Sequence, residues 1–167
     1  LAAITAREVL ARGGTAVDAA VALTFALSVT YPVAASLGGG GVCLVYDAAT
    51  DIVEAIDFLP RAPVAGGAIA VPGTVRGVAA LHSRYGRVPW SDLITPAEVL
   101  ARRGHPVSRA LASRLRDVQT SILGNSGLNV LFGIDGSSEI LREGDPLTQI
   151  ALSAVLAQIR LRGASEF

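Results

Sequence analysis

The chain has 167 residues, which is enough for one domain with a sizeable core. Hydrophobic residues make up 51% and charged residues 17%, and the formal net charge is zero, so neither nucleic acid nor an anionic membrane is indicated as a partner. The single cysteine, Cys43, excludes an internal disulfide framework and a cysteine metal cluster.

We expect the chain to be a piece of a longer protein, because it starts at Leu1 within an apparent helix and contains no Met. A low charged fraction fits a piece that buries surface against the remainder. No signal peptide is visible, and the sequence leaves open whether the compartment is periplasmic, secreted or cytoplasmic.

Two helices are predicted at the start of the chain. The first covers Leu1–Arg12 and ends at Gly13-Gly14, which is a C-cap signal. Thr15 begins a second helix over Ala16–Thr30, and Asp18 completes a pattern that resembles a capping box, with Asp in place of Glu. Because this helix is alanine-rich and apolar nearly all round, we expect it to be buried on most faces. It is too short for a membrane span.

Four consecutive glycines, Gly38–Gly41, follow that helix and precede the apolar run Val42–Tyr46, which is predicted to be a buried strand. Nucleotide binding is not indicated. A P-loop needs a lysine and all fourteen basic residues are Arg, while a dinucleotide fingerprint needs the order strand, glycines, helix. We therefore expect a loop that is glycine-rich because it is crowded, deep in the fold.

The rest of the chain is predicted to be one more strand followed by helices. A second strand over Ile52–Phe58 forms a hairpin with the first, and the prolines and glycines of Leu59–Gly67 predict irregular structure. The further predicted elements are a short extended piece at Ala68–Val71, helices over Thr74–Tyr85, Pro89–Arg103 with a break at Thr95-Pro96, Ser108–Gln119 and Asp145–Arg162, and a loop over Gly124–Gly136 apart from the apolar Val130-Leu131-Phe132. Ile150, Leu152, Val155, Leu156 and Ile159 form the apolar face of the last helix.

Few side chains with catalytic chemistry stand out. Cys43 lies in an apolar strand and is predicted to be a buried structural thiol rather than a nucleophile. His82 and His105 lack partners at metal-ligand spacing and are predicted to be surface or capping residues. Asp18 is interpreted as a helix cap rather than a catalytic acid. From the residues alone, the chain is a mixed α and β piece without a self-contained active site.

Several motifs together resemble the large subunit of the γ-glutamyltransferases. They occur in the family's order and cover nearly the whole chain: Gly13–Ala22, Ser36–Gly41, Val45–Asp47, Ala70–Gly77, Arg84–Trp90 and Arg142–Asp145. The resemblance implies the N-terminal-nucleophile hydrolase fold, an αββα sandwich of the α+β class, to which this chain would supply helices and part of the sheets. Residues 1–167 would then be a single partial domain, completed by a second chain.

The resemblance also implies where the chemistry lies. The family's precursor cuts itself to release a small subunit whose N-terminal Thr is the nucleophile, with its own α-amine as base. No such cleavage motif is present here, so we expect the nucleophile and the oxyanion-hole glycines beyond Phe167 and no catalytic residue on this chain. The resemblance implies neither a metal nor an organic cofactor.

One segment departs from the family pattern. After the second strand the family usually reads Asp-Phe-Arg-Glu-Thr-Ala-Pro, and its Arg binds the α-carboxylate of the γ-glutamyl group. Here Leu59 stands at that position, and the nearest arginine, Arg61, is two residues along. Arg61 is therefore the candidate substrate-binding residue, and the alternative is a solvated loop arginine. The connection from Pro63 to Ala70 is also shorter than usual, which would reshape the wall of the pocket.

The resemblance thus implies that the chain is most of the large subunit of a γ-glutamyltransferase-like amidohydrolase, which cleaves a γ-glutamyl or related small amide and transfers the acyl group from Thr to water or an amine. Two alternatives remain open. One keeps the fold and changes the substrate to another small carboxylate-bearing amide, such as an oxamate-like or acyl-antibiotic compound. The other is a relative that does not cleave and serves in binding or assembly.

Overall fold

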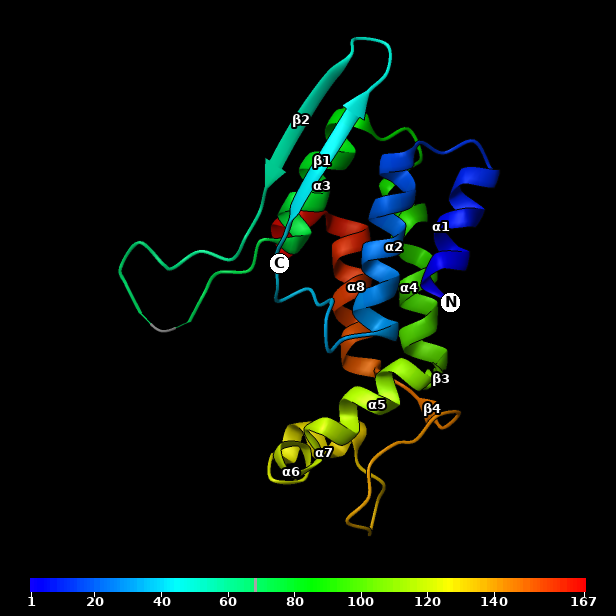
Figure 1. Ribbon diagram of the computed structural model, residues 1–167, viewed down its shortest axis with the longest axis vertical. Helices are drawn as coiled ribbons and strands as arrows, with labels where there is room; N and C mark the ends of the chain where they lie inside the picture. Colours follow the sequence, from blue (N-terminus) through cyan, green and yellow to red (C-terminus); the bar gives the residue numbers. More distant parts are fainter. Residues whose placement is uncertain (68) are drawn as a thin grey trace.

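Helix α2 (Ala16–Thr30) lies at the centre of the fold, where it packs against α1 (Ala2–Ala11), α3 (Thr74–Tyr85) and α4 (Trp90–Arg103) (Figure 1). The structure is a computed structural model that describes residues 1–67 and 69–167. Val21, Phe25 and Val29 of α2 have no exposed surface. This confirms the prediction that an alanine-rich helix without a polar face is buried on most sides.

The capping box at the start of α2 is confirmed. The Thr15 hydroxyl accepts a hydrogen bond from the Asp18 backbone N–H at 3.1 Å, and the Asp18 carboxylate accepts one from the Thr15 N–H at 2.8 Å. Gly13 has a φ of +86°, a left-handed conformation that favours glycine and allows the sharp turn between α1 and α2. The first two helices therefore begin and end within a residue or two of the expected positions.

An antiparallel hairpin of β1 (Val42–Asp47) and β2 (Ile52–Asp57) lies at one end of the molecule, beside α3 (Figure 1). Its inner face places Cys43 opposite Ile56, and both are half-buried against the main core. The carboxylate of Glu54 binds Arg84 and Tyr85 of α3. These contacts hold the hairpin on the helix.

The outer face of the hairpin is apolar and uncovered in this chain. Val42, Leu44, Tyr46 and Val53 are between 57% and 70% exposed. The prediction of a fully buried strand is therefore wrong for this chain, because successive side chains of a strand point to opposite faces and only one face meets the helices. Cys43 is half-buried rather than buried.

Helix α4 runs unbroken through Pro96, so the predicted break at Thr95-Pro96 is wrong. Proline removes one backbone hydrogen bond, but Leu93, Ile94 and Ala97 are completely buried against the neighbouring helices. Packing of this face against α2 and α8 (Ile150–Arg162) outweighs the loss.

Helices α4 and α8 are also joined by a buried carboxylate. Glu98 of α4 is 7% exposed and accepts hydrogen bonds from Arg102 at 2.5 Å and from Arg160 of α8 at 2.7 Å. The Trp90 ring N–H donates to the Ile159 carbonyl at 3.1 Å. Among the predicted apolar residues of α8, Leu156 and Ile159 are buried and Leu152 is half-buried, but Ile150 and Val155 are exposed.

A second, smaller core lies at the far end of the molecule, under α5 (Arg109–Asp117), α6 (Gln119–Leu123) and α7 (Ser126–Phe132) (Figure 1). The prediction of a loop over Gly124–Gly136 is wrong in part, because α7 lies within it. Asn125 caps α7 by accepting a hydrogen bond from the Leu128 N–H at 3.0 Å, and Phe132 is buried in the second core.

The last helix begins at Ile150 and not at Asp145-Pro146 as predicted. Pro146–Leu147 instead forms β4, which pairs antiparallel with β3 (His105–Pro106). His105 is 4% exposed, and its Nε2 lies 3.3 Å from the Val29 carbonyl oxygen, so the prediction of a surface or capping residue is wrong. A short 3-10 helix, η1 (Ala164–Glu166), follows α8.

The predicted α+β class is confirmed: helices predominate, and the strands form two small antiparallel sheets in the described part of the chain. None of the helices in residues 1–67 and 69–167 has the length and hydropathy needed to cross a membrane.

Candidate functional site

Three glycines surround Phe58, the residue that follows β2. A Cβ atom built on Gly40 or Gly73 would lie within 3.0 Å of the Phe58 backbone, and one on Gly77 would lie within that distance of the Phe58 ring. Gly73 and Gly77 lie one helical turn apart, at the start of α3. Glycine at these positions lets the strand end, the glycine loop and the helix approach closely.

Hydrogen bonds fix the glycine loop to the start of α3. The Gly39 carbonyl accepts the N–H groups of Gly73 at 2.8 Å and Thr74 at 3.1 Å, and the Thr74 hydroxyl donates to the Ser36 carbonyl at 3.1 Å. The loop therefore takes the place of a side-chain cap for α3, which has none. Crowding is confirmed at Gly40 and absent at Gly38, but both glycines are exposed and Gly39 and Gly41 are half-buried, so the expectation that the loop lies deep in the fold is wrong for this chain.

A groove of about 320 Å³ opens beside this junction, between the end of β2 and α3. Arg61 lines it and forms an isolated antiparallel bridge with Val71, whose N–H donates to the Arg61 carbonyl at 2.8 Å. This bridge closes the base of the irregular segment between β2 and α3. The extended piece predicted over Ala68–Val71 includes Ala68, which lies outside the described residues.

The groove contains two arginines and one carboxylate, namely Arg61, Arg76 and Asp57. Arg61 Nη2 donates to Asp57 Oδ2 at 3.1 Å, and Asp57 Oδ1 accepts the Leu59 N–H at 2.9 Å. The Arg61 side chain is 73% exposed, so this ion pair contributes at most about 1 kcal/mol to stability. Leu59, at the position where an arginine was expected from the resemblance, also lines the groove and is 50% exposed.

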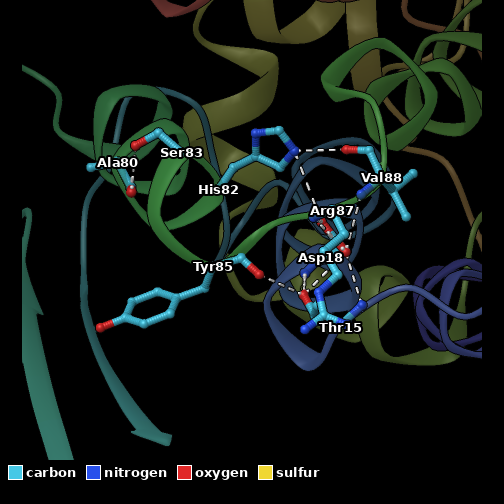
Figure 2. A network of polar contacts seen from close by, with 8 residues as sticks. All are labelled: Thr15, Asp18, Ala80, His82, Ser83, Tyr85, Arg87 and Val88. Atoms are coloured by element: carbon cyan, nitrogen blue, oxygen red, sulfur yellow. Dashed lines mark hydrogen bonds and ion pairs between the residues drawn. The ribbon is translucent and has the colours of Figure 1, made fainter.

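A second polar cluster surrounds the buried carboxylate of Asp18 (Figure 2). Besides Thr15, the backbone N–H of Arg87 donates to it at 3.0 Å and that of Val88 at 3.3 Å. Burial by itself raises the pKa of Asp18, but these hydrogen bonds together outweigh it and hold the pKa below its ordinary value. Asp18 therefore ties the α1–α2 turn to the segment after α3, which confirms its interpretation as a structural residue.

His82 lies next to this cluster and is half-buried, with 20% of its side chain exposed, so the prediction of a surface or capping residue is wrong. Its Nε2 lies 2.8 Å from the Val88 carbonyl oxygen and 3.9 Å from Asp18 Oδ1, and its ring packs against Trp90 with centroids 5.3 Å apart. Cys43 has its Sγ 3.9 Å from the Leu44 carbonyl oxygen. The structure brings neither residue to the groove that contains Arg61.

Reasoning from the sequence missed Asp57, Arg76 and the glycine contacts with Phe58 as parts of this site. The spacing of Gly73 and Gly77, four residues apart, was the available signal, because such a pair leaves one face of a helix open to close approach. Arg76 gave no signal, since nothing in the sequence shows that it lies beside the end of β2.

The family model described as gamma-glutamyltranspeptidase matches residues 2–167. The chain is 36% identical over 177 residues to Scoloptoxin SSD14 of Scolopendra dehaani, covering 96% of this chain and 31% of that protein. It is 34% identical over 189 residues to the glutathione hydrolase proenzyme of Bacillus subtilis strain 168, covering 100% of this chain and 32% of that protein. The crystal structure of Helicobacter pylori gamma-glutamyltranspeptidase is similar with a TM-score of 0.93 and 33% identity, over 99% of this chain and 53% of that one.

The chain thus spans about a third of the length of these curated relatives.

Proposed function

Because the chain belongs to the gamma-glutamyltranspeptidase family, we propose that it forms the large-subunit part of an amide-cleaving N-terminal-nucleophile hydrolase. The match of the family model over residues 2–167, together with the similarity to a solved family member over 99% of the chain, carries this proposal.

In the proposed reaction, the hydroxyl of an N-terminal Thr on the small subunit attacks the amide carbonyl. The α-amine of that Thr takes the hydroxyl proton, the amine leaves with a proton, and an acyl-Thr ester remains. Water or a second amine then attacks the ester and releases Thr. The large subunit supplies no reacting group and acts by holding the acyl group.

The small subunit, cut from the same precursor, completes the partial domain formed by residues 1–167. The outer face of the hairpin supports this proposal, because Val42, Leu44, Tyr46 and Val53 form a strongly exposed apolar surface on a two-stranded sheet. A two-stranded sheet with one bare apolar face is marginal by itself and gains stability when that face is covered.

Arg61 binds a carboxylate of the substrate in this proposal. It lines the groove beside the glycine loop, and a guanidinium can bind a carboxylate through two parallel hydrogen bonds. Leu59 cannot do so. The departure at Leu59 also favours the second candidate function, in which the same fold acts on another small carboxylate-bearing amide with its charge placed differently along the acyl chain.

The test uses the full-length protein. Mass spectrometry should find it cut into two chains, with Thr opening the smaller one, and the product should hydrolyse a γ-glutamyl anilide or a shorter carboxylate-bearing anilide. Absence of both cleavage and turnover would refute the enzymatic proposal and favour the binding or assembly alternative.

Arg61→Ala should lower kcat/KM for the preferred substrate by roughly 30-fold or more, which corresponds to a loss of about 2 kcal/mol or more. Arg61→Lys keeps the positive charge but loses the two parallel hydrogen-bond donors of the guanidinium. Its kcat/KM should therefore lie between those of the unaltered protein and Arg61→Ala. If Arg61→Ala changes no substrate by more than a few-fold while processing stays intact, Arg61 is a solvated loop arginine.

A further inference from the structure

The net positive charge of the groove resides on Arg76 rather than on Arg61. Arg61 and Asp57 lie 3.1 Å apart and together carry no net charge. Asp57 therefore offsets much of the attraction that Arg61 exerts on an approaching anion. Arg76 makes no hydrogen bond or ion pair with any of residues 1–67 and 69–167, and it leaves the groove with one uncompensated positive charge.

The local structure of α3 gives no reason for a cation at this position. Arg76 is the third residue of the helix, and its side chain is exposed. The first turn of a helix favours acidic side chains, because the free N–H groups there carry partial positive charge, yet α3 has no acidic residue in that turn. Arg76 thus adds positive charge where the helix itself disfavours it.

The walls around these charges suit a small organic anion. Leu59, Val71 and Pro72 line the groove together with Arg61 and Arg76, so a ligand in the groove has apolar surface as well as guanidinium groups to contact. The volume of about 320 Å³ lies at the lower end of the range for small-molecule sites.

We propose that Arg76 is the second cation of an anion site in this groove, and that it selects acyl groups which carry a carboxylate. Arg76 supplies the uncompensated charge and Arg61 supplies hydrogen-bond donors that Asp57 does not use. The role in substrate selection rests on the proposed function, whereas the binding of a carboxylate to the groove does not.

Asp57 provides a variant that acts in the opposite direction. Asp57→Asn removes the competing charge but keeps an oxygen that can accept the Leu59 N–H. It frees Arg61, so carboxylate affinity should rise, while Arg76→Ala should lower it. A merely structural role for either residue would not predict changes of opposite sign.

The experiment measures glutarate binding to the full-length protein by calorimetry at low salt, together with kcat/KM for a glutaryl anilide. The control is Arg7→Ala, which removes an exposed arginine from α1, away from the groove. Arg76→Ala should weaken glutarate binding about tenfold or more, Arg76→Lys should weaken it less, and Asp57→Asn should strengthen it a few-fold. The unfolding temperature of each variant verifies that it is folded.

The outcomes separate the two proposals. Glutarate binding that depends on Arg76 without any amide turnover would support the anion site and refute the proposed enzymatic function. A second outcome is that the protein cleaves the amide, but Arg76→Ala changes glutarate binding no more than Arg7→Ala does. This would overturn the anion site and leave the proposed function standing. Failure of the unaltered protein to bind glutarate would also overturn the anion site.

Discussion

Replacing Asp18 tests how much of the fold depends on one buried carboxylate. The side chain has no exposed surface, and it accepts hydrogen bonds from the backbone N–H groups of Thr15, Arg87 and Val88 and from the Thr15 hydroxyl (Figure 2). Asp18→Ala leaves the three backbone N–H groups without this acceptor, whereas the Thr15 hydroxyl can still donate to the Tyr85 carbonyl oxygen at 3.1 Å.

The magnitude follows from counting what is lost. Each buried backbone group left unsatisfied costs about 1–3 kcal/mol, and water reaches some of them because the cluster is only partly buried at Thr15. We expect a total loss of about 3–5 kcal/mol in the free energy of unfolding. Asp18→Asn keeps one acceptor oxygen but turns a donor toward a backbone N–H, so it should cost about 1–2 kcal/mol.

The assay is thermal unfolding of the full-length protein, with Asp117→Ala as the control. Asp117 is 59% exposed, and its only ion pair within the described part of the chain is with Arg114 at 3.5 Å, so this change should stay within about 0.5 kcal/mol. The reasoning is refuted if Asp18→Ala lowers the unfolding temperature by no more than the control does.

The pH dependence of the unfolding temperature of Asp18→Asn provides a second test of the role of this carboxylate. The pKa of Asp18 is lower in the folded than in the unfolded protein. The stability that this ionised group contributes is therefore fully present above its ordinary pKa of about 3.9 and is lost as the pH falls through the lower, folded value. The difference in unfolding temperature between the unaltered protein and Asp18→Asn should accordingly narrow below about pH 4.

Two further predictions concern the hairpin end of the molecule. Gly40→Val should block folding or processing, because a side chain there collides with the Phe58 and Pro60 backbone. Gly38→Ala should be tolerated, because the added Cβ meets the Ser36 hydroxyl at the ordinary contact distance of 3.8 Å. Normal processing of both variants would count against crowding at Gly40. Residues 1–167 expressed alone should bind a hydrophobic dye through the outer face of the hairpin, and Leu44→Ser should reduce that binding; a sharply melting monomer without dye binding would contradict this.

The sequence by itself determined the elements whose signals are local. Thr15 and Asp18 define the start of α2, and Ser108 defines the start of α5 by accepting the Leu111 N–H at 3.2 Å. Such side-chain caps act between residues three or four positions apart, so a single sequence displays both partners. Helix α3 has no side-chain cap, but it also begins and ends at the predicted residues, Thr74 and Tyr85.

The tertiary structure alone decided features that depend on residues far apart in the chain. Pro146–Leu147 became a strand because it meets His105–Pro106, and α7 formed within an expected loop because the second core receives Phe132. Propensity and pattern are weak guides where such distant contacts supply the stabilisation.

In the candidate groove, too, one residue could be found from the sequence and the others only from the tertiary structure. The resemblance directed attention to Arg61, which lies in the segment directly after β2. Arg76 and Asp57 are nineteen positions apart in the sequence, and only the packing of α3 on the end of β2, allowed by the missing side chains at Gly73 and Gly77, brings them to one groove. A charge cluster of this kind cannot be read from spacing, because the contact that creates it is made by backbone atoms approaching closely in space.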